Sequence, residues 1–553
     1  MVSSVSVPIT PPQSSQHGET LRNRIEIVAE DLPELERFYN IKTSPERAAR
    51  LRAYYDKQLT DLATHVAFNA LDQQGKVDYL LLKNHLERLR RQLELEVARD
   101  RKTEPLLQPF ASTITALCEN RQKARPLDAK KAAQDVHDVQ KAIQALKAQV
   151  QDAQITLDRT SAFRAAITVD ELRAHLAEWY GFYQGYDPLF TWWVSKPYAA
   201  TDQQLGEYAA LIREKLVGIK PGEQDDAIVG QPIGRDGLLV ELEAEKINYT
   251  PEELLWIGEQ EYAGCETEMK KISRAMGFGD DWRRALAVVR EDYVEPGQQT
   301  RLVRDLAAEA IEYVQKHDLV TVPPLAAETW RMFMMASERQ KVNPFFLGGE
   351  SIIVSYPPDT MYHEAKLMSM RGNNIHYSRA TVFHELIPGH HLQLFINTRY
   401  RPYRRLFGTP FSIEGWALYW EIILWDDERF PKTAYKQGWD ALLAHAPVHA
   451  HYLLHQVPPR LDEPARVHRP TGRQGRARAC HGRGRSASLA QRRLLSPLSG
   501  WLHARRSTAV FSPPGVGHQW PDGREGVPRP DPAQQPDAHR VCAGPADRPA
   551  SEP

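Results

Sequence analysis

Three histidines and a glutamate stand within one apolar segment, TVFHELIPGHHLQLF, at residues 381–395. A hydrolytic zinc site needs three protein ligands, an open position for water and a nearby carboxylate that takes a proton from that water. In the HExxH motif, two histidines four residues apart share one helical face with the glutamate. His384 and Glu385 supply the first half of such a motif, but His390 and His391 follow six and seven residues after His384.

The longer spacing does not fit a regular helix. A residue six positions after His384 lies about 120° off its face, and one seven positions on lies about 10.5 Å further along the axis. Pro388 cannot donate to the carbonyl of His384, and Gly389 relieves steric limits. A bulge or wide turn at this Pro-Gly pair could therefore return His390 to a shared metal.

A third ligand is expected on a second helix, in the segment PFSIEGWALYWEIILWDD at residues 410–427. Glu414 stands near its start, 24 residues after His390, and Glu421 lies on the same face two turns later. An acidic side chain in so aromatic a segment is costly to bury unless it is paired or metal-bound. Glu414 is the candidate ligand, and Glu421 is the alternative ligand or a residue that supports one.

Two further residues could contact a substrate. His376 lies in GNNIHYSRATVF, where a surface histidine is the other interpretation. Arg399 belongs to a cluster with Arg401, Arg404 and Arg405 that could bind a carboxylate-bearing ligand or be a solvated basic loop. Histidines on an apolar helix are often hydrogen-bonded core residues, so a structural role is the alternative for the whole histidine segment.

The elements around these residues have mainly helical patterns. Apolar residues recur at three and four within residues 44–63, 77–97 and 129–154, the last being typical of a long exposed or paired helix. A helix is expected after Thr250 as N-cap, with Pro251 in its first turn, Glu253 at the capping-box position and Gly277 as its stop.

That helix presents one predicted core face, and two strands are expected nearby. The face comprises Leu255, Tyr262, Cys265, Met269, Ile272 and Met276. Strand patterns occur in DLVTVPPL, residues 318–325, and GGESIIVSYP, residues 348–357. The predicted class is mainly α with a small β-sheet.

The composition of the chain limits which binding partners can be expected. The chain has 553 residues, 42% hydrophobic residues and a formal net charge of -1, which allows a sizeable core and gives no reason to expect a nucleic acid or an anionic membrane as partner. Its four scattered cysteines form no CxxC pair. The polar N-terminus lacks a signal-peptide pattern, and no apolar run reaches roughly 18 residues. A soluble cytoplasmic protein is expected.

Three regions are predicted. Residues 1–20 form a disordered N-terminal tail, and residues 21–436 form a mostly helical domain with an N-terminal part to about 240 and a motif-bearing part to 436. Residues 437–553 contain no Lys, Ile, Asn or Met and are predicted to be a disordered low-complexity tail. The missing residues have AT-rich codons. A more specific interpretation is therefore that residues 437–553 are translated from a GC-rich gene in a wrong reading frame. Synonymous codons for residues 499–510 also permit an ordinary amphipathic sequence one base over.

The motifs HELIPGHHLQ and EGWALYWE resemble the domain of unknown function 885 family, which is classed with zincin-type metallopeptidases of the glutamate-ligand branch. VDYLLLKN, TPEELLWIGEQEY and NPFFLGGESIIVSYPPDTM are similar to its members, so the resemblance runs from about residue 35 to 435. It implies a mostly helical zincin-like scaffold around a deep cleft, with a small β-sheet at the active site.

The resemblance also implies site roles. His384, His390 and Glu414 would bind Zn²⁺, Glu385 would be the catalytic general base, and His391 would position a neighbour or replace His390 as ligand. ESIIVSYP would be the edge strand that holds an extended peptide substrate. The family continues past residue 435 with helices that close the cleft, and this chain departs from it there.

These features lead to one prediction and two alternatives. The prediction is a zinc-dependent peptidase, inactive in this product if the aberrant C-terminal part leaves its cleft open. The alternatives are a catalytically dead truncated relative and a helical binding or scaffold protein with structural histidines. The sequence predicts no oligomeric state.

Overall fold

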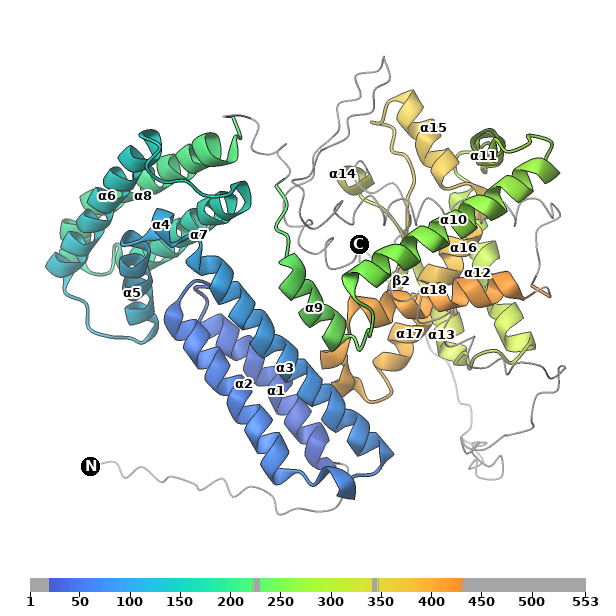
Figure 1. The fold of residues 1–553 in the computed structure, drawn as a ribbon, viewed down its shortest axis with the longest axis horizontal. Helices are drawn as coiled ribbons and strands as arrows, with labels where there is room; N and C mark the ends of the chain where they lie inside the picture. The colour runs from blue at the N-terminus through green and yellow to red at the C-terminus, as the bar shows by residue number, and fades with distance from the viewer. Residues whose placement is uncertain are drawn as a thin grey trace, which may run out of the picture. The chain divides into compact units, whose positions relative to one another are not determined.

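The computed structural model describes residues 19–220, 222, 229–340, 346, 348–427 and 429–430. These residues are mainly helical, with one two-stranded sheet (Figure 1), so the predicted mainly α class with a small sheet is confirmed. The zincin-like scaffold and its cleft stay predictions. The two predicted disordered tails lie outside the described residues, except that Glu19 and Thr20 begin the first helix.

The first three helices pack around a core of their own. They are α1 (Glu19–Phe38), α2 (Pro45–His65) and α3 (Gln73–Arg101), with the short η1 (Phe68–Ala70) between the last two. Ser44 and Asp72 begin α2 and α3, because each side chain accepts a hydrogen bond from a backbone N–H in the first turn. Apolar residues at helical spacing form the shared core: Leu21, Ile25, Val28, Leu51, Tyr54, Leu82 and Leu86.

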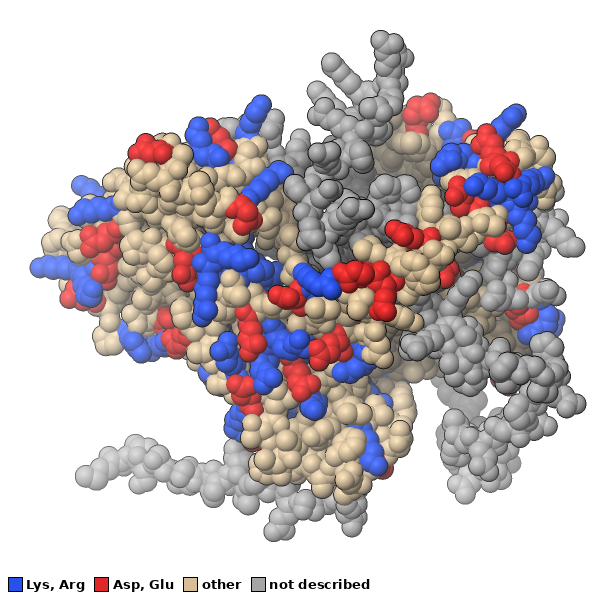
Figure 2. Space-filling view, in the orientation of Figure 1, with Lys and Arg blue, Asp and Glu red and all other residues tan. Residues whose placement is uncertain are grey.

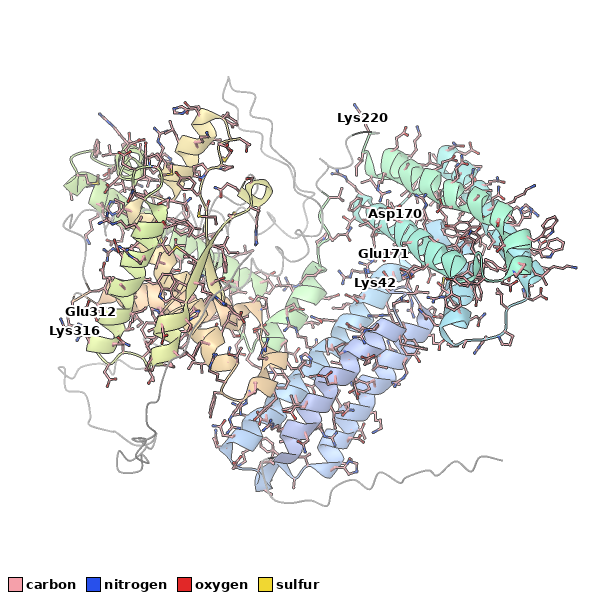
Figure 3. All side chains as sticks on the ribbon, turned by 180° about the vertical axis from the view of Figure 1, so that it is seen from behind. Lys42, Asp170, Glu171, Lys220, Glu312 and Lys316 are labelled. Atoms are coloured by element: carbon pink, nitrogen blue, oxygen red, sulfur yellow. The ribbon has the colours of Figure 1, made fainter. Side chains whose placement is uncertain are left out.

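The next helices form a second bundle. They are α4 (Glu104–Leu107), α5 (Phe110–Gln122), α6 (Ala129–Gln151), α7 (Arg159–Tyr183), α8 (Pro188–Ile212) and η2 (Arg213–Val217). The predicted long helix is α6, and it pairs with α8 (Figure 1), where the Thr201 hydroxyl donates to the Val136 carbonyl at 3.1 Å. Lys42, after α1, pairs with Glu171 of α7 at 2.5 Å between Nζ and Oε1 (Figure 3).

Helices α9 (Gly234–Ala244) and α10 (Pro251–Ala275) come next. The predicted capping box is present, because the Thr250 side chain accepts from the Glu253 N–H while Glu253 bonds back to Thr250. Gly277 has φ +84°, as its predicted stop position requires. The predicted core face of α10 is only partly covered: Met269 and Ile272 are buried, whereas its other four residues are half-buried.

The motif-bearing part is built from short helices around α12. They are α11 (Trp282–Arg290), α12 (Gln299–Lys316), α13 (Pro324–Thr329), α14 (Ser337–Gln340), α15 (His363–Gly372), α16 (Ile375–Glu385), α17 (His390–Asn397), η3 (Pro402–Phe407) and α18 (Pro410–Asp426). Val382 and Leu386, at the end of α16, pack with Val303 of α12 and with two strand residues, Ile352 and Val354. This core fixes the end of α16, where the histidine motif begins.

The sheet contains one predicted strand and one that the pattern missed. β1 (Arg331–Met334) pairs in parallel with β2 (Ser351–Val354), and β2 lies within the predicted GGESIIVSYP segment. The strand predicted at residues 318–325 was wrong, because Pro324 begins α13 there. Leu319 and Val320 pack into the core as irregular chain, which explains their apolar, β-branched pattern.

On the face that Figure 2 shows, Lys and Arg side chains are interspersed with Asp and Glu side chains. This distribution agrees with the formal net charge of -1. Among the helices that the structure describes, none combines the length and the apolar character that crossing a bilayer would need.

A buried carboxylate connects α3 to the segment between α17 and α18. Asp78 is 1% exposed and accepts from Arg404 Nε at 2.6 Å and from the Tyr403 hydroxyl at 2.8 Å. Leu406 and Phe407 pack against the α1–α3 core beside it. The carboxylate that Arg404 binds is therefore Asp78 of the chain itself, which corrects the interpretation of this arginine as a solvated or ligand-binding residue.

Replacing Asp78 with alanine should destabilise the fold by about 3–5 kcal/mol, because Arg404 would keep a partly buried charge without its partner. Asp56→Ala is the matched control, since Asp56 is half-exposed and its pair with Arg90 at 3.2 Å is worth about 1 kcal/mol or less. Urea denaturation followed by circular dichroism measures both. Equal shifts in the two variants would contradict the anchoring role of Asp78.

Candidate metal centre

The histidine motif occupies two short helices joined by a turn. α16 ends at Glu385 and α17 begins at His390, with residues 386–389 between them. The Gly389 N–H donates to the Phe383 carbonyl at 2.9 Å, six residues back, which closes a wide turn. The turn predicted at Pro388 and Gly389 is therefore present. It absorbs the extra residues of the motif and brings the His384 and His390 rings to 4.6 Å between centroids.

The residue at position 389 must be glycine, because two backbone carbonyl groups lie where a Cβ atom would be. A Cβ atom on it would lie 1.9 Å from the His384 carbonyl oxygen and 2.4 Å from that of Phe383. The turn is also fixed from outside by Trp416 of α18, whose Nε1–H donates to the Pro388 carbonyl at 2.9 Å and faces that of Gly389 at 3.3 Å. Trp416 is thus a positioning residue, and its type and spacing in the sequence did not indicate this role.

Helix α18 brings both candidate glutamates to the histidines. The Thr409 hydroxyl accepts from the Ser412 N–H and begins the helix, with Pro410 in its first turn. Glu414 and Glu421 are seven residues apart and share one face. Glu414 Oε2 lies 3.3 Å from His384 Nε2 and 3.5 Å from His390 Nε2, whereas Glu421 Oε1 lies 2.6 Å from His384 Nδ1.

The two glutamates therefore hold different positions. Glu421 Oε1 lies within hydrogen-bond distance of His384 Nδ1, and a neutral ring that donates from Nδ1 to this carboxylate would offer the lone pair of Nε2 on the side of Glu414 and His390. A carboxylate behind a ligating histidine fixes the ring and its tautomer in many metal sites. Of the two alternatives for Glu421, the geometry favours the supporting one.

His384, His390 and Glu414 are the residues that could hold a metal ion, and the two separations that involve Glu414 match those expected around zinc. One donor atom from each lies within 4.8 Å of the others, and two of the separations are 3.3 and 3.5 Å. Ligands about 2.0–2.1 Å from a tetrahedral zinc ion lie about 3.4 Å apart. Two imidazoles and one carboxylate also leave the fourth position open, as hydrolytic sites require.

The clustered histidines and glutamates shift one another's pKa values. Burial alone would lower the pKa of His384, but its hydrogen bonds with Glu414 and Glu421 raise that pKa well above its usual value. Burial would raise the pKa of Glu414, yet the two histidines hold it well below its usual range. Burial lowers the pKa of His390. The carboxylates thus favour positive charge on His384, whereas burial disfavours the charged form of His390.

His391 faces away from this cluster. Its Nδ1 lies 3.0 Å from the Glu350 carbonyl and its Nε2 lies 3.1 Å from the Ala326 carbonyl, so both ring nitrogens contact backbone oxygens. These contacts connect α17 to the residue before β2 and to α13. Between the two candidates that the sequence left open, only His390 lies beside His384 and Glu414.

Glu385 is buried beside the histidine pair, and its Oε2 is 3.9 Å from His390 Nε2. Its side chain lies directly over Gly348, three residues before β2. A Cβ atom on Gly348 would lie 2.0 Å from Glu385 Oε2 and 2.7 Å from Glu385 Cβ. A side chain at position 348 would therefore displace Glu385. The only trace of this contact in the sequence is the Gly-Gly pair before β2.

On the expectation that the cluster is a hydrolytic zinc site with Glu385 as its general base, Gly348→Ala should retain zinc and slow hydrolysis of a peptide by about 10²-fold, because displacement of a catalytic group by about 1 Å costs on that order. Gly408→Ala is the control, since its new methyl group would meet nothing closer than the Arg405 carbonyl oxygen at 3.4 Å. Zinc content and turnover are measured on both proteins. Full turnover in Gly348→Ala would show that Glu385 does not need this space.

The two predicted substrate contacts lie outside the cluster. His376 is buried in the first turn of α16, where its Nε2 bonds to Asp292 Oδ2 at 2.7 Å, so it is not a surface histidine. Arg399 lies after α17, donates to the Phe395 carbonyl at 3.0 Å and stacks on the Phe395 ring. Neither contact involves a metal-cluster residue, and their substrate roles stay predictions.

Fold and site together define a mainly helical protein with a partly buried His-His-Glu cluster that could hold a metal ion. The chain belongs to the DUF885 family, described as bacterial protein of unknown function, which it matches over residues 40–437. No curated protein matches the chain.

A solved structure from Shewanella oneidensis, provisionally named a lipoprotein of unknown function, is similar to this chain with a TM-score of 0.56 and 16% identity. The match covers 90% of this chain and 94% of that one. At this identity the likeness shows the fold alone.

Proposed function

We propose that this protein binds one zinc ion through His384, His390 and Glu414 and hydrolyses peptide bonds, with Glu385 as general base. The observation that carries the proposal is the convergence of three donor atoms within 4.8 Å, with the Glu385 carboxylate beside them. Three ligands, an open position and a neighbouring carboxylate are the parts that a hydrolytic zinc site requires.

Three further residues of the chain would each have a separate role in hydrolysis. When bound, zinc would make a water molecule acidic and polarise the substrate carbonyl. Glu385 would accept the proton of that water on its carboxylate and pass it to the departing amine nitrogen. Glu421 would hold His384 in the tautomer that offers Nε2, and Trp416 would hold the turn that positions His390.

A peptide is the proposed substrate because of β2. β1 pairs with one edge of this strand, and among the described residues no strand pairs with the other. An extended peptide can add to such an edge through backbone hydrogen bonds. Glu350 and Gly348, just before β2, contact His391 and Glu385, so the strand begins beside the cluster.

We also propose that residues 437–553 come from a shifted reading frame and that the natural protein is cytoplasmic. The family match ends at residue 437, where Lys, Ile, Asn and Met disappear from the sequence. A chain that lacks the helices that close the family's cleft would keep its three metal ligands. It could therefore bind zinc without hydrolysing peptides. A catalytically dead relative and a helical scaffold protein with structural histidines are the two competing functions.

The deciding experiment compares this chain with one in which the gene's family-like frame is restored after Lys436. Both are given a mixture of fluorogenic peptides, with and without the zinc chelator 1,10-phenanthroline. We expect the restored protein to cleave peptides and the chelator to abolish cleavage. Zinc binding without cleavage in either protein would favour the dead relative, and no zinc in either would favour the scaffold.

A further inference from the structure

Two loops come together at one end of the α5–α8 bundle. Arg121 at the end of α5 lies over Phe182 at the end of α7, and Lys130 at the start of α6 lies over Trp193 at the start of α8. Further along, Thr201 bonds to Val136, so α6 and α8 run in parallel away from this end. The α5–α6 and α7–α8 connections therefore meet there, and we call this end the bundle tip.

The bundle tip exposes large apolar side chains from the α7–α8 connection. The exposed fractions are 56% for Phe182, 87% for Tyr186, 67% for Leu189, 80% for Trp192 and 41% for Trp193. Leu189, Trp192 and Trp193 share the outer face of the first turns of α8, opposite the buried Phe190 and Val194. Apolar side chains grouped on a surface in this way mark interaction sites, whereas isolated ones are ordinary.

Cations surround these side chains. Arg121 Cζ lies 5.3 Å from the Phe182 ring centre and Lys130 Nζ lies 5.1 Å from the Trp193 ring centre. Arg121, Arg125, Lys130 and Lys196 form no ion pair with any carboxylate in the described part of the chain. Asp128 and Asp187, which stand in the same two connections, accept backbone N–H groups as helix N-caps, Glu119 of α5 accepts from the Ser44 hydroxyl, and Asp202 of α8 pairs with Arg173. These four cations outnumber the two N-cap carboxylates of the connections, which the near-neutral charge of the whole chain does not reveal.

We propose that the bundle tip docks on an anionic lipid surface, with Tyr186, Leu189 and Trp192 entering the headgroup region. Tryptophan and tyrosine favour that depth because their rings are apolar at one end and polar at the other. Neighbouring lysine and arginine side chains reach anionic headgroups while their stems lie along apolar surface. This peripheral contact goes beyond the proposed hydrolysis and does not depend on it.

The charges favour lipid over a second copy of the chain as the occupant. Two copies joined tip to tip would bring the same unpaired cations together, and like charges across an interface oppose association. Anionic headgroups would instead neutralise them. The apolar face supplies the remaining affinity, which scales with the apolar area that is buried.

The test is flotation of the full chain with vesicles of phosphatidylcholine alone and of an equimolar phosphatidylcholine–phosphatidylserine mixture. We expect binding to the anionic vesicles and a loss of about tenfold or more in the double variant Tyr186→Ser/Trp192→Ser, since binding scales with buried apolar area. Trp256→Ser is the matched control, because Trp256 of α10 is 61% exposed outside the bundle tip. Circular dichroism checks that each variant is folded.

The Arg-rich sequence after Lys436 can also attract anionic vesicles, so only the difference between variants is diagnostic. Binding that is equal in the wild-type and double-variant proteins would overturn the proposal, as would no binding to anionic vesicles at all. Light scattering of the lipid-free proteins measures whether a second copy of the chain occupies the bundle tip instead. A dimer that the double variant abolishes, without vesicle binding, would assign the tip to a second copy.

Discussion

Replacing Glu385 with glutamine should leave the zinc content unchanged and slow peptide hydrolysis by about 10²-fold or more, the scale of general-base catalysis. The glutamine side chain has the same size, so it fits over Gly348 as Glu385 does, but it cannot accept the proton from water. Zinc content by mass spectrometry and turnover by the fluorogenic assay measure the two effects separately. The frame-restored protein is used for turnover.

Glu312→Gln is the control for this prediction, since Glu312 is an exposed residue of α12 (Figure 3) outside the cluster. Unchanged turnover in Glu385→Gln would remove Glu385 from the mechanism. Loss of zinc from that variant would make Glu385 a ligand, and the cluster of His384, His390 and Glu414 would then need revision.

Replacing His390 with alanine should abolish stoichiometric zinc binding, whereas His391→Ala should retain it. Removal of one of three ligands is expected to weaken zinc binding by more than about 100-fold, because even residues behind the ligands contribute 10–100-fold. The two ring nitrogens of His391 contact the Glu350 and Ala326 carbonyls, so loss of this side chain should lower stability instead. Zinc titration of both variants, together with thermal denaturation, separates these effects. The reverse pattern would make His391 the ligand.

Local signals in the sequence predicted individual elements well. The capping box at Thr250 and Glu253, and the apolar segment that contains β2, depend on residues a few positions apart. The segment at residues 318–325 has the same kind of apolar pattern, yet it packs as irregular chain before α13. A short β-branched segment shows that a residue is buried, but it does not show whether another strand lies beside it.

Contacts between distant residues could not be predicted in the same way. Arg404 and Asp78 are 326 positions apart, and neither sequence neighbourhood indicates the other. The arginine cluster therefore had two open interpretations, and both missed its internal partner. The bundle tip was missed for a related reason, because a balanced net charge says nothing about which cations the fold brings together.

The sequence was sufficient to predict which residue types form the candidate site and which helices carry them. The Pro388-Gly389 pair indicated the turn, and the acidic residues of α18 indicated the second helix. The choice between His390 and His391 depended on the direction of each side chain after the turn, and the Glu350 carbonyl before β2 and the Ala326 carbonyl of α13 hold the His391 ring. Gly348 gave no chemical signal, because its role is to leave room for Glu385.

X-ray absorption at the zinc edge tests the central claim most directly. The purified chain is loaded with zinc, dialysed against metal-free buffer and measured. We predict one zinc ion per chain with only nitrogen and oxygen neighbours, about 2.0–2.1 Å away, and with the outer-shell scattering of two imidazole rings. No zinc after dialysis, a sulfur neighbour at about 2.3 Å, or scattering from a single imidazole would contradict a site built from His384, His390 and Glu414.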